Sequence, residues 1–291
     1  MVQVSYSTGG FGGVGLEDAL DQIAAAGFGC VEFSCDQHGV EDRPSSVAGD
    51  VSRQLQQRGM TATTVHGPAR RNVLGAPTEE WRTEKIQVLA DALRLTGEIG
   101  AQGMVIHGIP NPMFLPEGED IRSFYAVMVD AMRRSVADLV PVAEEAGVRI
   151  LLENLPYNWD LKTAGQEGDY PLMHMEDLRA FVDEFPAEQV GLIVDVGHSW
   201  TNGQDPAAEI LAAGDRLWGT HLQDVDRDDP RDNHWAPLQG GLDWLAIIAA
   251  LQQVDYQGTY TFEVIMPRHE ETAEELARMT FAVAEVWGLI P

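Results

Sequence analysis

Short apolar runs alternate with longer amphipathic stretches along the whole chain. The short runs are rich in Val, Ile and Leu, which is typical of buried strands, and the longer stretches have helical spacing. Three of the amphipathic stretches end in a glycine just before the next apolar run, as in AAAGFGCVEF, EIGAQGMVIH and EEAGVRILLE. This order suits a helix C-cap that leads into a strand. We expect strands at 4–7, 30–34, 62–66, 103–107, 149–153, 191–195, 217–221 and 259–263, and helices that include 16–26, 79–100, 125–146, 175–184, 242–253 and 270–287.

Strict alternation of strands and helices predicts a parallel α/β sheet with right-handed crossovers. An open doubly wound sheet and a closed barrel are both compatible with this alternation. The glycine-rich segment 9–15 lacks the GxGxxG spacing that marks nucleotide-binding open sheets, so we interpret it as a loop. The count of eight strands favours a (β/α)₈ barrel, of the TIM barrel type. Since no linker interrupts the pattern, we expect a single catalytic domain over residues 1–291.

Composition narrows the classes of partner. The formal net charge is −27, and Lys85 and Lys162 are the two lysines of the chain. Such a surface repels nucleic acid and anionic membrane, so neither is expected as a partner. No apolar run is long enough to cross a bilayer, and the N-terminus lacks the features of a signal peptide. Cys30 and Cys35 would lie roughly 16 Å apart on one strand, too far for a disulfide, which favours a reduced, cytoplasmic protein.

Polar side chains recur where the expected strands end. In a barrel these ends converge on one mouth, where active sites lie. Several carboxylates brought together there would repel one another unless a cation holds them. The residues at or near the strand ends are Glu32, His66, His107, Glu153, Asp195, His198, His221, Asp224 and Glu263.

One set of four recurs at equivalent strand ends and predicts a metal site. Glu153, Asp195 and Glu263 supply carboxylates, and His221 supplies one imidazole. This oxygen-rich set suits one divalent ion, with manganese expected and magnesium, cobalt or zinc as alternatives. His66 and His107 fit either a ligand or a histidine packed nearby. His198 can orient a ligand or contact substrate, and Glu32 can bind a substrate hydroxyl or cap a loop.

The motifs ENLP, VDVGHSW, HLQDVDRDDPRDNHWAPLQGGLDW and FEV resemble the sugar phosphate isomerase/epimerase family of xylose isomerase-like barrels. The resemblance implies that Glu153, Asp195, His221 and Glu263 bind the metal. It further implies that Glu153 and Glu263 move protons on a ketose through an enediolate, which makes the protein an isomerase or epimerase. A sugar or polyol is then the substrate, and a homodimer or homotetramer is expected. Further substrate contacts are assigned to His66, His107, His198, His234, Glu32 and Trp159, with Trp200 or Trp235 as other stacking residues.

Other activities fit the same resemblance. A lyase or dehydratase acting on a keto-inositol or a 3-keto-glycoside is the main alternative, and a sugar-binding barrel without turnover is another. Endonuclease IV, a relative, has a larger zinc cluster, and its additional ligands correspond here to His66, His107, His198, Asp232 and His234; the net charge argues against a nuclease. Gln239 stands where many family members have a glutamate. The long segments 155–174 and 223–241 are expected to shape the pocket.

Overall fold

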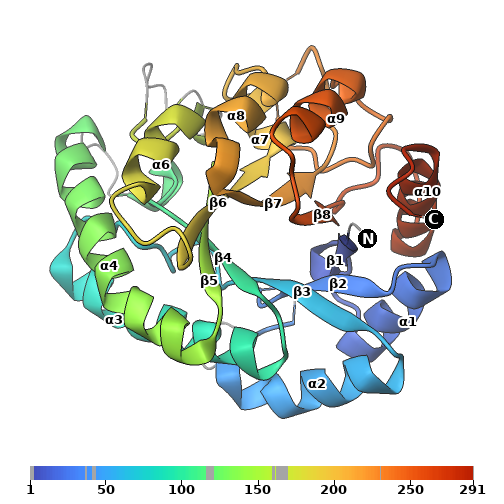
Figure 1. The fold of residues 1–291 in the computed structure, drawn as a ribbon, viewed down its shortest axis with the longest axis horizontal. Helices are drawn as coiled ribbons and strands as arrows, with labels where there is room; N and C mark the ends of the chain where they lie inside the picture. The colour runs from blue at the N-terminus through green and yellow to red at the C-terminus, as the bar shows by residue number, and fades with distance from the viewer. Residues whose placement is uncertain are drawn as a thin grey trace.

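The computed structural model describes residues 3–36, 38–40, 44–115, 121–158, 161, 170–229 and 231–290. Its eight parallel strands form a closed barrel in sequence order, because β1 pairs with β8 as well as with β2 (Figure 1). This confirms the barrel over the open sheet. The strands are β1 (Gln3–Ser7), β2 (Cys30–Ser34), β3 (Thr61–His66), β4 (Gly103–His107), β5 (Arg149–Glu153), β6 (Val190–Asp195), β7 (Leu217–Leu222) and β8 (Thr259–Phe262).

Helices surround the barrel (Figure 1). Glycines in the left-handed conformation end α1 and α4, as the AAAG and EEAG motifs predict: Gly27 has φ 114° and Gly147 has φ 69°. Thr272 and Glu275 form a capping box that starts α10 at Ala273, three residues later than the sequence pattern predicts. The helices are α1 (Leu16–Ala26), α2 (Ala48–Gln57), α3 (Glu79–Glu98), α4 (Tyr125–Ala146), α6 (Met175–Val182), α7 (Val196–Thr201), α8 (Pro206–Ala213), α9 (Trp244–Gln253) and α10 (Ala273–Val286).

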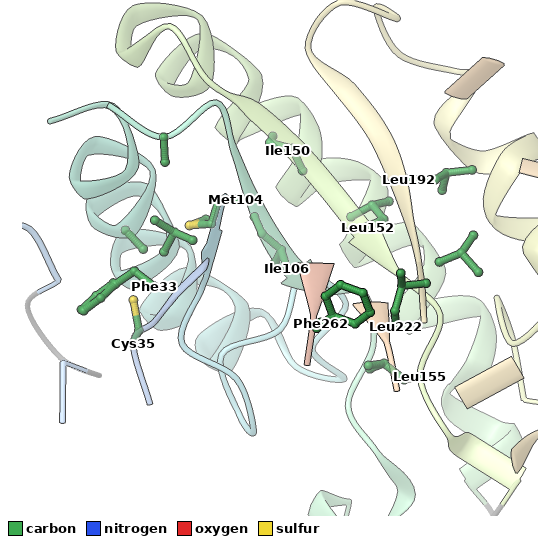
Figure 2. Close-up of a cluster of buried hydrophobic side chains, with 14 of the residues drawn as sticks. Phe33, Cys35, Met104, Ile106, Ile150, Leu152, Leu155, Leu192, Leu222 and Phe262 are labelled. Atoms are coloured by element: carbon green, nitrogen blue, oxygen red, sulfur yellow. The ribbon is translucent and has the colours of Figure 1, made fainter. Parts of the chain in front are cut away.

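Alternate residues of each strand face opposite sides of the barrel wall. The outward set packs against the helices in the large core, which includes Ile106, Leu152 and Phe262 (Figure 2). The inward set forms a separate small cluster of Val105, Leu151 and Ile193, with Trp218 packed against it. Two residues further along their strands come His107, Glu153 and Asp195. The period of two therefore places an apolar layer inside the barrel below a polar one.

The glycine-rich segment after β1 is a connection, as expected, and begins with the short 3₁₀ turn Thr8–Gly10. Cys30 and Cys35 are free thiols. In the part of the chain that the structure describes, no helix combines the length and the apolar character needed to span a membrane.

Candidate metal centre

Four side chains from four strand ends meet at the carboxyl end of the barrel. One ligand atom from each of Glu153, Asp195, His221 and Glu263 lies within 4.8 Å of the others. His221 Nδ1 is 2.9 Å from a Glu153 oxygen, 3.1 Å from a Glu263 oxygen and 4.0 Å from an Asp195 oxygen. All four residues are buried. We call this group the tetrad. These are the four residues that the sequence predicts as ligands. The expected strand 259–263 is one residue shorter in the structure, because β8 ends at Phe262 and Glu263 follows it directly.

Two histidines approach the tetrad from β3 and β4. His107 Nε2 lies 3.3 Å from Glu153 Oε2, and His66 Nε2 lies 3.8 Å from the same oxygen. The three side chains can hold a metal ion of their own. His107 is the more accessible imidazole, with 18% of its side chain exposed against 11% for His66. Their position beside Glu153 fits a metal ligand or a proton carrier.

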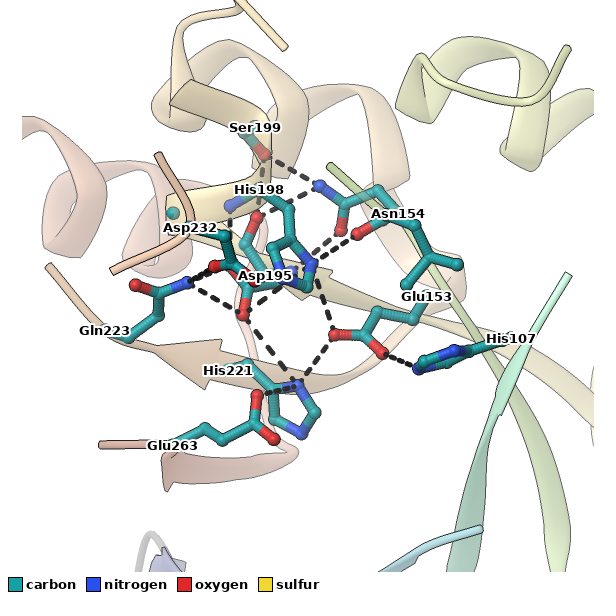
Figure 3. A network of polar contacts seen from close by, with 12 residues as sticks. His107, Glu153, Asn154, Asp195, His198, Ser199, His221, Gln223, Asp232 and Glu263 are labelled. Atoms are coloured by element: carbon teal, nitrogen blue, oxygen red, sulfur yellow. Dashed lines mark hydrogen bonds and ion pairs between the residues drawn. The ribbon is translucent and has the colours of Figure 1, made fainter. Parts of the chain in front are cut away.

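His198, Asp232 and His234 form a second triad of possible ligands. His198 and Asp232 lie across the tetrad from His107 (Figure 3). His198 Nε2 is 3.3 Å from Asp232 Oδ2, and His234 Nε2 is 3.0 Å from Asp232 Oδ1. His234 also has its Nδ1 3.0 Å from the Glu263 carbonyl oxygen, next to the tetrad. Asp232 is the most accessible of the three, with 27% of its side chain exposed. This triad therefore forms part of the rim of the mouth.

Gln223 connects the second triad to the tetrad. Its Nε2 donates to Asp195 Oδ1 at 3.2 Å and to Asp232 Oδ1 at 3.0 Å, while its Oε1 accepts from the His234 amide at 3.0 Å. The Asp195 carboxylate also caps α7, because Oδ1 accepts from the His198 amide at 2.7 Å. Asp195 Oδ1 is thus occupied by protein donors, and Oδ2 is the oxygen left for a ligand.

Asp224 anchors the segment 223–241 and does not belong to the tetrad. The residue is fully buried, and its backbone pairs with that of Trp235. Its carboxylate accepts four hydrogen bonds: from the amides of Val225, Leu238 and Leu242, and from Trp244 Nε1. These bonds fold the segment back on itself and place Asp232 and His234 at the mouth. The described part of this segment is therefore a loop that hydrogen bonds to Asp224 hold in place and that carries residues of the site.

Negative charge dominates the mouth, and the imidazoles respond to it. Burial lowers the pKa of His221, but the carboxylates of Glu263, Glu32 and Glu153 outweigh this and raise it well above its ordinary value. Burial also lowers the pKa of His234, but the carboxylates of Asp232 and Glu263 outweigh this effect and raise that pKa to about 10. Burial raises the pKa of Asp195 to about 6, in spite of the nearby imidazoles. The raised pKa values of His221 and His234 mean that the carboxylates draw positive charge to the mouth, as protonated imidazoles or as a bound cation.

This environment fits a divalent cation. The tetrad offers three carboxylates and one imidazole, a donor set that suits manganese, magnesium, cobalt or zinc. Glu153 Oε2 is buried and accepts no well-formed hydrogen bond, although His107 Nε2 lies 3.3 Å away, which is costly for a carboxylate unless a cation contacts it. The donor set and this incompletely satisfied oxygen both match a metal site.

The remaining predicted substrate residues lie in different places. Glu32 is fully buried, with both oxygens 3.1 Å from His221 Nε2, on the side of the ring that faces away from the tetrad. Trp200 packs against the large core, and Arg268 lies over the Trp235 ring at 4.8 Å. Trp159 falls outside the described residues.

Sequence reasoning missed the amides that organise the site. Asn154 Oδ1 accepts from the Asp195 amide at 2.8 Å, and its Nδ2 donates to the Asp195 carbonyl at 3.0 Å, which aligns the ends of β5 and β6. Asn154 directly follows Glu153, and Gln223 lies two residues after His221. An Asn or Gln next to a predicted ligand at a strand end could therefore have identified both residues from the sequence.

Sugar epimerases are among the known proteins that resemble this chain. The D-psicose 3-epimerase of Enterocloster bolteae is 25% identical over 246 residues, which cover 84% of this chain and 75% of that protein. The L-ribulose 3-epimerase of Methylomonas sp. is 32% identical over 148 residues, 50% of this chain and 44% of that one. The structure of 3-keto-D-glucoside 4-epimerase from E. coli matches with a TM-score of 0.75 and 19% identity, over 98% of this chain and 100% of the other.

These similarities support an isomerase or epimerase, as the sequence predicts. The family model described as xylose isomerase-like TIM barrel matches residues 20–282. The chain therefore belongs to the xylose isomerase-like TIM barrel family.

Proposed function

We propose that the protein is a metal-dependent epimerase or isomerase of a small ketose, with residues 1–291 acting as one catalytic domain. The observation that carries the proposal is the tetrad: three carboxylates and an imidazole whose ligand atoms lie within 4.8 Å of one another at the mouth of the barrel. The epimerase relatives support the same class of reaction. Glu153, Asp195, His221 and Glu263 would hold the cation, which when bound supplies Lewis-acid polarisation of a sugar carbonyl.

Glu153 and Glu263 are the proposed proton-transfer groups. Both carboxylates lie beside the His221 ring nitrogen, at 2.9 Å and 3.1 Å, so a sugar bound to a cation at the tetrad would be within reach of both. One carboxylate removes the proton next to the carbonyl and the other returns one. Return to the same carbon from the opposite face gives an epimer, whereas return to the neighbouring carbon gives an aldose–ketose isomer.

The histidines around Glu153 extend this scheme. His107 Nε2, 3.3 Å from Glu153 Oε2 and partly exposed, can pass a proton between that carboxylate and the mouth. Burial raises the pKa of Glu153, but attraction to His221 and hydrogen bonds from His107 and His221 hold it well below its ordinary value. His66, His198 and His234 line the mouth as donors for sugar hydroxyls.

The test combines metal content, proton exchange and product analysis. The purified protein and Glu153→Ala are assayed for bound metal, and ketoses such as D-psicose, L-ribulose and D-tagatose are incubated with the protein in D₂O. We expect one equivalent of metal that Glu153→Ala loses, and deuterium at the epimerised carbon. Glu263→Gln should keep metal and lose deuterium incorporation, while Glu271→Gln, a glutamate outside the tetrad, should keep both. An elimination product would favour the lyase alternative, and no metal after reconstitution would refute the proposal.

A polynuclear metal site is the second candidate, favoured by the two flanking triads. His66 and His107 share Glu153 with the tetrad, and His198, Asp232 and His234 form a separate group of ligands. Three ions would suit phosphodiester hydrolysis of the endonuclease IV type, which the net charge of −27 opposes. About three zinc ions per chain, together with cleavage of abasic DNA, would favour this candidate over the epimerase.

A further inference from the structure

Glu32 and His221 form a contact that the reaction itself does not use. His221 comes from β7 and is fully buried, with its ring stacked on that of His66 at a centroid distance of 5.9 Å. Its Nδ1 faces the tetrad carboxylates of Glu153 and Glu263. Its Nε2 faces away from them, toward Glu32 of β2, and lies 3.1 Å from each oxygen of that carboxylate.

The backbone of β2 and a neighbouring hydroxyl fix the position of Glu32. A register shift between Val31 and Glu32 interrupts the pairing with β3, so that Glu32 pairs with Thr64. The extra residue is Thr63 of β3, so the shift brings Thr64, in place of Thr63, opposite Glu32. Thr64 Oγ1 then donates to Glu32 Oε2 at 2.8 Å. The Glu32 carboxylate has no exposed surface, so it is available neither to substrate nor to solvent.

Both ring nitrogens of His221 lie between carboxylate oxygens, but only Nδ1 faces the tetrad, where it would bind the cation; the ring hydrogen then belongs on Nε2, beside Glu32. A ring nitrogen placed between two carboxylate oxygens is stabilised as a donor, because an unprotonated nitrogen would oppose its lone pair to theirs. With the hydrogen on Nε2, the lone pair of a neutral His221 is on Nδ1 and points into the tetrad. A negative charge behind the ring also makes that nitrogen a stronger donor to a cation.

We propose that Glu32 is a positioning residue for the metal centre, which fixes the Nε2–H form of His221 and strengthens Nδ1 as a ligand. The inference rests on the metal site of the proposed function, and it assigns to Glu32 a role in metal affinity in place of a substrate contact. Thr64 belongs to the same chain of contacts, since its hydroxyl orients the Glu32 carboxylate.

Metal affinity tests the proposal. Metal-free wild type, Glu32→Gln and Thr64→Val are titrated with Co²⁺, followed by visible absorption, and with Mn²⁺, followed by calorimetry. Mutating a residue that hydrogen-bonds a metal ligand typically lowers metal affinity about 10- to 100-fold. Glu32→Gln should therefore bind metal at least roughly 10-fold more weakly than wild type, and Thr64→Val a few-fold more weakly. The matched control is Glu209→Gln, a buried glutamate on α8 that accepts from the Met175 amide, and its affinity should stay within about twofold of wild type.

A spectroscopic readout separates positioning from a loss of packing. Nitrogen-15 spectra of the metal-loaded wild type should show His221 with its hydrogen on Nε2, and the Co²⁺ absorption bands should shift in Glu32→Gln and not in Glu209→Gln. A folded Glu32→Gln with wild-type affinity and spectrum would overturn the inference. If Glu32→Gln does not fold, unchanged affinity in Thr64→Val overturns it instead. Wild type that binds no metal would contradict the proposed function itself, which is a different result.

Discussion

Replacing Asp224 with asparagine tests whether one buried carboxylate holds the loop that carries Asp232 and His234. In the wild type, Oδ1 accepts from the amides of Val225 at 3.0 Å and Leu242 at 3.2 Å. Oδ2 accepts from the Leu238 amide at 2.9 Å and from Trp244 Nε1 at 2.8 Å. Asparagine keeps one acceptor oxygen and presents an NH₂ group to the other two donors.

The expected loss follows from those two donors. Each buried donor left without a partner costs about 1–3 kcal/mol, and the neutral amide is easier to bury than a carboxylate, which offsets part of the loss. We therefore expect Asp224→Asn to lower the free energy of unfolding by about 3 kcal/mol. Urea unfolding followed by circular dichroism measures it, provided that the slope with denaturant is unchanged.

Asp243→Asn is the matched control. Asp243 is exposed and caps α9 through a hydrogen bond from the Ala246 amide at 3.1 Å, a role that asparagine fills equally well. Its free energy of unfolding should change by less than about 0.5 kcal/mol. A loss below about 1 kcal/mol for Asp224→Asn would show that the four hydrogen bonds do not hold the loop.

Three further substitutions test the packing and charge of the fold. Gly191→Ala should destabilise the protein by about 1–3 kcal/mol in urea unfolding, because the new Cβ would clash with Trp218 Cδ1; a neutral effect would mean that the indole moves freely. Phe262→Ala should lower stability by about 3–5 kcal/mol, since this ring is fully buried in the large core, and a smaller loss would require the cavity to collapse. Burial raises the pKa of Glu209, so its contribution to stability is present at low pH and is lost as pH rises above the ordinary glutamate range. Glu209→Gln should therefore gain stability relative to wild type between pH 4 and pH 7 in thermal unfolding scans, and a difference that is constant with pH would contradict the shift.

The pattern of the chain by itself determined the elements and the ligand set. Strand periodicity and glycine stops are local properties, so β4, β5 and the ends of α1 and α4 could be predicted within a residue or two. The four tetrad residues could be identified because they recur at equivalent strand ends, and a closed parallel barrel brings such ends together whatever the details of packing. Amphipathic α2, which has a short and strongly polar sequence, was not among the expected helices.

Only the tertiary structure decided what each polar side chain contacts. Glu32 and Asp224 both looked like candidates for the mouth, yet Glu32 lies behind His221, where a register shift in β3 brings Thr64 opposite it, and the fold of the segment 223–241 surrounds Asp224 with backbone donors. Gln223 connects Asp195 to Asp232 for the same reason. A one-residue shift in strand pairing or a loop that folds back changes the partner of a side chain without changing the hydrophobic pattern, so these contacts depend on packing between residues far apart in the chain.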